Sequence, residues 1–255
     1  MAELSRVFTD RRRAESFGSV AENYDRYRPQ YPQALISRLV TRPGLRVLDV
    51  GAGTGILSAQ LAAAGADVLA VEPDEQMAAV GSAKGIPFER STFEGWQAEG
   101  RTFDLITFGQ SFHWVDPAAA LPKLASLLNP DGRLVLMWNR IKPDEPLRHD
   151  LERISAEFGA TTPAANSASN AETALQTLLR TSDFAVERIE AGEDLHYAGE
   201  DWLNLVFTHS NHIILAPDAQ TELRQRLRTA IGDGGVSATN DALALSCSFT
   251  PERRG

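Results

Sequence analysis

Residues 45–55 read LRVLDVGAGTG, and this stretch decides the fold. Its first half is a short apolar run typical of a buried strand. Its second half places Gly51, Gly53 and Gly55 ahead of a helical pattern at residues 54–64. Glycine permits a tight turn and lets a ligand approach the backbone closely. The helix start offers free N–H groups and a positive dipole end, so the loop is suited to an anionic group.

An acid, Glu72, follows about twenty residues later, at the end of the next predicted strand. A carboxylate at that place accepts hydrogen bonds from both ribose hydroxyls of a nucleoside. The dinucleotide fingerprint G-x-G-x-x-G needs a glycine at position 56, which is Ile56, and the G-K-[ST] of a P-loop is absent. The spacing of the glycines therefore disfavours a nicotinamide-dependent oxidoreductase. The presence of Glu72 disfavours a purely structural glycine-rich turn without a ligand.

Strand and helix patterns alternate ahead of Gly159. We expect strands at 45–50, 66–71, 86–90, 103–108 and 133–138. We expect helices at 54–64, 74–80 and 116–128, with a turn at 129–132 (NPDG). Near-continuous apolar strands separated by helices predict a mostly parallel sheet that is covered on both faces.

The C-terminal part is less regular. We expect strands at 184–189 and 241–249, an amphipathic segment at 171–180, and helices at 201–207 and 218–229. Two further helices, at 11–27 and 32–40, precede the first strand. The predicted fold is a doubly wound, Rossmann-like α/β sheet with an N-terminal helical lid and a C-terminal helical cap insertion. The expected parts are a lid at 1–41, a ligand-binding core at 42–158, and the remaining strands with the cap at 159–255, after a soft segment at 159–170.

Composition narrows the possible partners. The chain has 255 residues and a formal net charge of −9, which repels nucleic acid on average; the cluster Arg11–Arg13 reads as a solvated helix face. Its one cysteine, Cys247, excludes an internal disulfide and cysteine-rich zinc sites. No apolar run approaches the ~20 residues of a membrane span, and no apolar signal core opens the chain. We expect a cytoplasmic protein without a membrane partner.

Several segments together resemble class I S-adenosylmethionine-dependent methyltransferases. The residues that carry the resemblance are 47–55, 70–77, 91–94, 103–110 and 129–134. Residues 17–29 (FGSVAENYDRYRP) are similar to the N-terminal helix of small-molecule methyltransferases, including those similar to trans-aconitate methyltransferase. The resemblance covers roughly residues 45–140 and implies S-adenosyl-L-methionine as cofactor and a small organic molecule as methyl acceptor.

The resemblance also implies a cofactor site. In it, Gly51, Ala52, Gly53 and Gly55 form the loop, Asp49 supports them, and Glu72 holds the ribose. The residues that would flank the adenine are Pro73, Met77, Thr92 and Phe93. Tyr24 and Arg28 would close over the cofactor from the lid, although Tyr24 serves equally as a packing aromatic. Gln110 would hydrogen-bond the methionine portion or line the methyl channel.

Methyl transfer from a sulfonium mainly requires alignment and exclusion of water, with a base only for a protonated acceptor. His113 follows a strand end, where such sheets bind ligands, and its ordinary pKa suits proton removal near neutrality. The alternative is that His113 only shapes the pocket. Trp114, His196 and His209 are the candidate acceptor contacts. His209 and His212 are spaced for one helix face, but no carboxylate or cysteine completes a metal site, so we expect none.

The sequence thus predicts methyl transfer to a small molecule, with oxygen the favoured acceptor atom and nitrogen, carbon and sulfur open. A lone Cys247 in a predicted strand offers no nucleophile for pyrimidine methylation, and the amino-methylating signature [DN]-P-P-[YF] is absent. Two other functions stay open: an S-adenosylmethionine-binding protein that does not methylate, and an NAD(P)-dependent oxidoreductase. The sequence does not define the oligomeric state.

Overall fold

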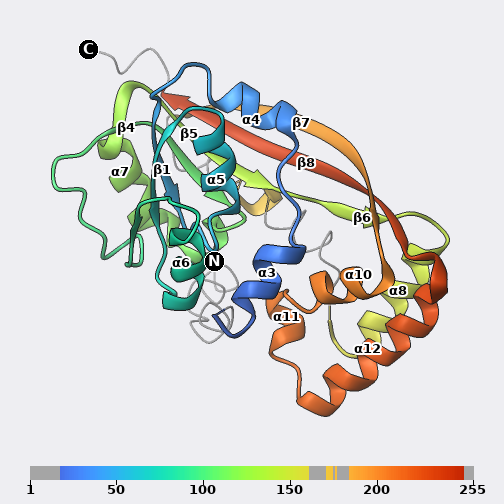
Figure 1. Ribbon diagram of the computed structural model, residues 1–255. Coiled ribbons are helices and arrows are strands. Elements are labelled where there is room, and N and C mark those ends of the chain that lie inside the picture. The colour runs from blue at the N-terminus through green and yellow to red at the C-terminus, as the bar shows by residue number, and fades with distance from the viewer. Residues whose placement is uncertain (1–17, 161–170, 175, 177–183, 250–255) are drawn as a thin grey trace.

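A central eight-stranded sheet organises the chain (Figure 1). The computed structural model describes residues 18–160, 171–174, 176 and 184–249. The strands are β1 (Arg46–Val50), β2 (Asp67–Val71), β3 (Phe88–Glu89), β4 (Phe103–Gly109), β5 (Leu128–Trp138), β6 (Ile141–Pro143), β7 (Phe184–Tyr197) and β8 (Val236–Phe249). Their order is β3-β2-β1-β4-β5-β8, with β6 continuing along the β5 edge of β8 and β7 on its other edge. Strands β1 to β5 are parallel, and β8 runs antiparallel to β5, so the mostly parallel, doubly wound sheet is confirmed.

Helices flank the sheet and form the cap. The α-helices are α3 (Ala21–Tyr27), α4 (Gln33–Leu39), α5 (Ile56–Ala63), α6 (Glu75–Ser82), α7 (Pro117–Leu127), α8 (Leu147–Glu157), α10 (Gly199–Val206), α11 (Ser210–Ile213) and α12 (Pro217–Ile231). Short 3-10 turns are η1 (Gly18–Val20), η2 (Phe112–Trp114) and η3 (Gly232–Gly234). Asp74 caps α6 by accepting hydrogen bonds from the backbone of Gln76 and Met77. Asp116 caps α7 in the same way, so each cap fixes the residue at which its helix begins.

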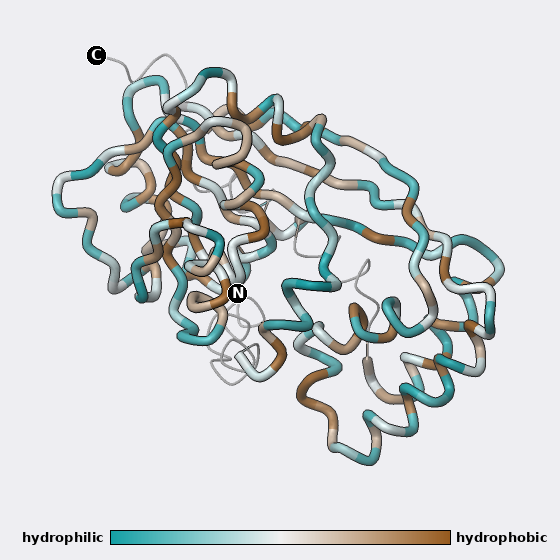
Figure 2. Tube along the Cα trace, in the orientation of Figure 1, coloured by the Kyte–Doolittle hydropathy of each residue, from teal (hydrophilic) through white to brown (hydrophobic). Residues whose placement is uncertain are grey.

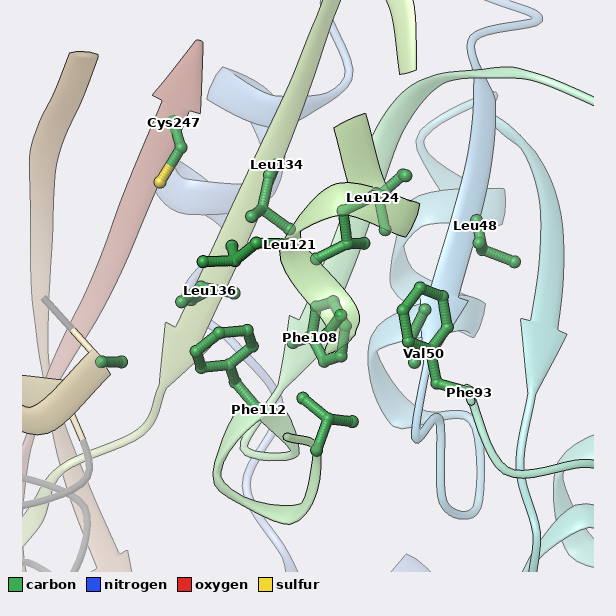
Figure 3. Close-up of a cluster of buried hydrophobic side chains, with 14 of the residues drawn as sticks. Leu48, Val50, Phe93, Phe108, Phe112, Leu121, Leu124, Leu134, Leu136 and Cys247 are labelled. Atoms are coloured by element: carbon green, nitrogen blue, oxygen red, sulfur yellow. The ribbon is translucent and has the colours of Figure 1, made fainter. Parts of the chain in front are cut away.

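The strands alternate their buried side chains between two faces, as a pleated strand requires. On one face Leu48, Phe108 and Leu136 pack with Leu121 and Leu124 of α7 (Figure 3). On the other face, residues of the same strands pack with α4 and α5: these are Val47, Leu105, Val135, Leu35, Leu57 and Leu61. Both faces of the central strands are therefore covered by helices, which leaves the strand ends as the place where a ligand can approach.

A third apolar cluster stabilises the cap. It joins α8, α10 and α12 to β6 and the start of β8, through residues that include Leu151, Trp202, Leu203, Leu223 and Leu227. The cap helices α10 to α12 are inserted between β7 and β8, as predicted (Figure 1). Figure 2 shows hydrophobic colour along the central strands and polar colour along much of α12, as expected for a surface helix.

Several boundaries differ from the prediction. The expected turn at 129–132 is wrong: these residues lie within β5 and form a bulge, since Phe103 pairs with Leu128 while Leu105 pairs with Arg133. β7 and β8 are 14 residues each, far longer than expected, because they pair with each other along their whole length. β3 has only two residues.

Some expectations lie outside the described residues. These are the cluster Arg11–Arg13, the start of the first helix, most of the soft segment at 159–170, and most of 171–180. Within the described part of the chain, no helix combines the length and apolarity needed to span a membrane.

Candidate functional site

The glycine loop between β1 and α5 has the backbone that only glycine adopts easily. Gly51, Gly53 and Gly55 have φ values of +63°, +58° and +73°. A Cβ on Gly51 would lie 2.6 Å from the Cβ of Ser111, so the loop packs directly against the end of β4. These glycines keep the backbone free of side chains at the carboxyl edge of the sheet.

Asp49 supports this loop from below. Its carboxylate accepts hydrogen bonds from the hydroxyl of Ser58 on α5 at 2.6 Å and from that of Thr107 on β4 at 2.8 Å. Asp49 is buried, and this burial raises its pKa to about 6. The residue therefore ties β1, β4 and α5 together under the loop, which is the supporting role that the sequence predicts.

Glu72 lies at the end of β2, beside the loop. Its carboxylate accepts hydrogen bonds from the backbone N–H of Gly53 at 2.8 Å and of Asp74 at 3.0 Å. The side chain is 7% exposed, and burial raises its pKa to about 7, while the two N–H donors act in the opposite direction. A carboxylate with both oxygens anchored to backbone is held in place to accept further hydrogen bonds from a ligand.

A cavity opens beside the loop. Five of the predicted cofactor residues line it: Tyr24, Arg28, Asp49, Ala52 and Gln110. The other lining residues are Pro29, Tyr31, Ile56, Leu57, Gly109 and Asn139. The structure thus brings together the lid, the loop and the ends of β4 and β5 around one space.

The lid helix α3 is fastened to both the cap and the core. Arg28 donates from Nε to Thr208 Oγ1 at 2.8 Å and from Nη2 to the Thr208 carbonyl at 3.1 Å. Its guanidinium also lies 4.6 Å from the centre of the Tyr24 ring. Lys84, at the end of α6, forms an ion pair with Asp25 of the lid. The lid is therefore closed over the cavity by polar contacts on two sides.

Gln110 and Asn139 mark the ends of neighbouring strands. Gln110 has φ +58°, rare for a residue other than glycine, and its N–H donates to the Met137 carbonyl at 2.8 Å. Asn139 is buried; its Nδ2 donates to the carbonyl of Pro29 at 3.2 Å, and its Oδ1 accepts from Asn240 at 2.9 Å. The sequence analysis missed Asn139, although its place directly after a strand was the available signal. No sequence pattern around Tyr31 indicated that this residue would line the cavity.

The predicted adenine residues lie in different environments. Met77 is buried beside the loop, where a Cβ on Gly53 would lie 3.3 Å from its Cε, whereas Pro73 is exposed. Thr92 is exposed and accepts a hydrogen bond from the Gly95 N–H. Phe93 is buried, with its ring edge-to-face on Phe108. Phe93 thus belongs to the core, whereas Pro73 and Thr92 lie at the surface.

His113 lies in η2, directly after β4, with its ring 4.6 Å from that of Trp114. Its Nδ1 is buried and has no hydrogen-bond partner within the described residues. Burial lowers the pKa of His113 to about 4, so its ordinary pKa is not a guide to its behaviour here. A general base is usually held in orientation by a third group, and no such group contacts His113 Nδ1 in the described chain, so a pocket-wall role is favoured.

The two other predicted acceptor contacts are separated. His196 is exposed on β7, with Nδ1 3.1 Å from Ser237 Oγ, and does not line the cavity beside the loop. His209 precedes α11 and follows Thr208, the residue that Arg28 contacts. Burial lowers the pKa of His209 well below its usual value, and the Arg28 charge adds to this. Only His209 of this pair lies close to the lid.

Comparisons with known proteins agree with this architecture. The chain is 40% identical over 136 residues to an uncharacterized methyltransferase of Mycobacterium tuberculosis, over 49% of this chain and 52% of that protein. It is 37% identical over 99 residues to a ubiquinone biosynthesis O-methyltransferase of Parvibaculum lavamentivorans, over 36% of this chain and 39% of the relative. This chain thus matches about half the length of the Mycobacterium tuberculosis protein and a smaller part of the Parvibaculum lavamentivorans protein.

Solved structures share the fold. A putative type II methyltransferase from Anaeromyxobacter dehalogenans matches with a TM-score of 0.65 at 18% identity, covering 88% of this chain and 98% of that one. A methyltransferase from Thiobacillus denitrificans, solved with S-adenosyl-L-homocysteine, matches with a TM-score of 0.51 at 16% identity, over 89% and 96% of the two chains. The family model described as methyltransferase domain matches residues 24–189. With its strand order and glycine loop, the chain belongs to the methyltransferase-domain family and has its Rossmann-like class I fold.

Proposed function

We propose that this protein transfers a methyl group from S-adenosyl-L-methionine to a small organic acceptor. The observation that carries the proposal is the pairing of Glu72 with the glycine loop: a buried carboxylate, fixed by two backbone N–H groups, beside three glycines with positive φ. This arrangement fits an adenosine, because the ribose hydroxyls are donors and the loop backbone leaves room for close approach. The adjoining cavity lies at the ends of β4 and β5, where the amino-acid part of the cofactor would be held.

The cofactor supplies an electrophilic methyl group whose leaving group is already good. The residues of this chain then have three tasks. Glu72 holds the ribose, Gln110 and Asn139 line the space at the strand ends, and the lid with Tyr24 and Arg28 excludes water. Excluding water and holding the reactants in line account for most of what such a displacement needs.

We propose a small organic acceptor with oxygen as the favoured atom. The similarity to proteins named ubiquinone biosynthesis O-methyltransferase supports oxygen. The net charge of −9 disfavours nucleic acid as the acceptor. His113 and Trp114 are the proposed walls on the acceptor side.

A thermal-shift comparison tests the cofactor. S-adenosyl-L-homocysteine should raise the melting temperature, and NAD(P) should leave it unchanged. Stabilisation by NAD(P) alone would contradict the proposal and favour an oxidoreductase. Single-turnover reactions with methyl-labelled cofactor and a panel of phenols, carboxylates and amines then test transfer; cofactor binding without transfer to any of them would favour a protein that binds but does not methylate.

A further inference from the structure

The loop that follows β3, residues 90–96, begins beside Glu72. The N–H of Ser91 donates to the Glu72 carbonyl at 3.3 Å, and the N–H of Glu72 donates to the Glu89 carbonyl at 3.2 Å. The start of the loop is therefore attached to the residue that we propose to hold the ribose.

One lysine of α7 holds this loop through its backbone. The Lys123 ammonium donates to the carbonyls of Phe93 and Trp96 and, at 3.4 Å, to that of Glu94. It also lies 4.7 Å from the centre of the Phe93 ring and 5.8 Å from that of the Trp96 ring. A lysine has three N–H donors, and here all three are directed at carbonyls of a single loop.

The far end of the loop has a second, separate attachment. Trp96 is buried, and its indole N–H donates to the Glu89 carboxylate, which also accepts from Arg101 Nη2 at 3.0 Å. The Arg101 guanidinium lies 5.1 Å from the centre of the Trp96 ring. Loss of the Lys123 ammonium should therefore loosen the loop without releasing Trp96 from the core.

The strand order indicates which part of the cofactor this loop would meet. In an adenosyl amino acid, the base and the amino-acid part are attached to opposite ends of the ribose. We place the ribose at Glu72, after β2, and the amino-acid part at the ends of β4 and β5. Because β3 lies on the other side of β2 from β1 and β4, the base is directed toward the loop that follows β3.

We propose that Lys123 is a positioning residue for the base of the cofactor: its ammonium holds the loop backbone in the shape that receives the base. This inference rests on the proposed function. Thr92, Glu94 and Gly95 are exposed, so side-chain packing does little to fix this part of the loop. Without the ammonium, the loop would have to be ordered when the cofactor binds, and that entropic cost would weaken affinity.

Calorimetry of the whole protein with two ligands tests the proposal. S-ribosyl-L-homocysteine has the ribose and amino-acid part of S-adenosyl-L-homocysteine but lacks the base. Lys123→Met should weaken S-adenosyl-L-homocysteine about tenfold and leave S-ribosyl-L-homocysteine within about twofold of the wild type. Lys123→Arg keeps a positive charge with N–H donors and should bind S-adenosyl-L-homocysteine more tightly than Lys123→Met. Lys142→Met, at an exposed lysine of β6, is the matched control and should change neither affinity.

Hydrogen exchange without any ligand tests the same role independently of the cofactor. The amides of Gly95 and Trp96 donate to the Thr92 hydroxyl and carbonyl, and they should exchange faster in Lys123→Met than in the wild type. Unchanged exchange at both amides overturns the proposal.

The proposal is also overturned if Lys123→Met binds S-adenosyl-L-homocysteine as the wild type does, or if Lys123→Arg binds it no better than Lys123→Met. An equal loss of affinity for both ligands would indicate a general folding defect and overturn it too. Failure of the proposed function has a different signature, because the wild type itself would then not bind S-adenosyl-L-homocysteine.

Discussion

In the proposed cofactor site, binding depends on the Glu72 carboxylate and on the environment that sets the pKa of this group. Burial raises its pKa to about 7, although the N–H groups of Gly53 and Asp74 favour the ionised form. The ionised carboxylate is the form that accepts hydrogen bonds from two ribose hydroxyls. Binding of an adenosyl ligand should therefore be linked to the ionisation of this single side chain.

Cofactor affinity should rise with pH. Between about pH 6 and about pH 8 the ionised fraction of a group with a pKa of about 7 rises roughly tenfold, so S-adenosyl-L-homocysteine should bind about tenfold more tightly at the higher pH. Equilibrium dialysis with labelled ligand across this range measures the change. Glu72→Gln should bind weakly at every pH and lose the dependence. Glu75→Gln, at an exposed neighbour, is the control and should keep it; a wild-type affinity that does not vary with pH would rule out this role for Glu72.

We propose that His113 forms part of the pocket wall and is not a general base. A ring with a pKa of about 4 is a weak proton acceptor near neutrality, and its Nδ1 has no partner in the described chain to orient it. His113→Ala should therefore lower turnover by less than about tenfold and leave the pH profile of kcat unaltered. A loss of about 10²–10⁴-fold, the range typical for removing a general base, would contradict this and restore the catalytic role.

Among the elements, the lid helix α3 is attached to its neighbours by a few polar contacts in addition to the packing of Ala21 and Tyr27. Arg28 joins it to Thr208 after α10, and Lys84 joins it to α6. The end of the same segment is held by Asn139, which accepts from Asn240 and donates to the Pro29 carbonyl. The lid thus has separate attachments to the core and to the cap.

Removing the cap attachment should loosen the lid. Arg28→Ala deletes both hydrogen bonds to Thr208 and should weaken S-adenosyl-L-homocysteine binding by about tenfold or more, with faster hydrogen exchange in α3. Arg26→Ala changes an exposed arginine on the same helix and should alter neither. Unchanged exchange in α3 of Arg28→Ala would show that this contact does not hold the lid.

The elements also show what a sequence can predict. The apolar run before Gly51 and the Asp74 cap of α6 are local signals, and both elements were predicted correctly. The bulge at 129–132 and the length of β7 depend on pairing with distant strands, which no local pattern encodes. The fold brings Asn139 and Tyr31 to the cavity from separate parts of the sequence, so the sequence did not predict these two lining residues. The residue roles, the acceptor and the domain boundaries stay predictions.

At the scale of the whole molecule, two sets of buried ionisable groups have opposite effects on stability as pH changes. Burial lowers the pKa of His113, His209 and His212, so the folded state resists their protonation. Burial raises the pKa of Asp49 and Glu72, so the folded state resists their ionisation. The contribution of the histidines to the free energy of unfolding decreases as pH falls below their usual pKa of 6.5. The contribution of the two carboxylates decreases as pH rises through about 6 and about 7.

Below neutrality the three histidines outweigh the two carboxylates, so the free energy of unfolding of the wild type should rise from about pH 5 to about pH 7 and level off above it. Glu72 opposes this rise, because its ionisation in the folded state should cost about 1 kcal/mol between about pH 6 and about pH 8. Urea unfolding at several pH values measures the curve. Between these two pH values Glu72→Gln should gain about 1 kcal/mol more stability than the wild type, and Glu75→Gln should follow the wild type. Equal changes in the wild type and in Glu72→Gln would be inconsistent with a buried Glu72 of raised pKa.

The central claim is that Glu72 and the glycine loop hold an adenosyl ligand. Isothermal titration calorimetry of the whole protein with S-adenosyl-L-homocysteine tests it most directly. The wild type should release or absorb heat with one site per chain, and Glu72→Ala should bind at least about tenfold more weakly while its unfolding remains cooperative. No heat from the wild type at any temperature tried, or equal affinity in Glu72→Ala, would contradict the claim.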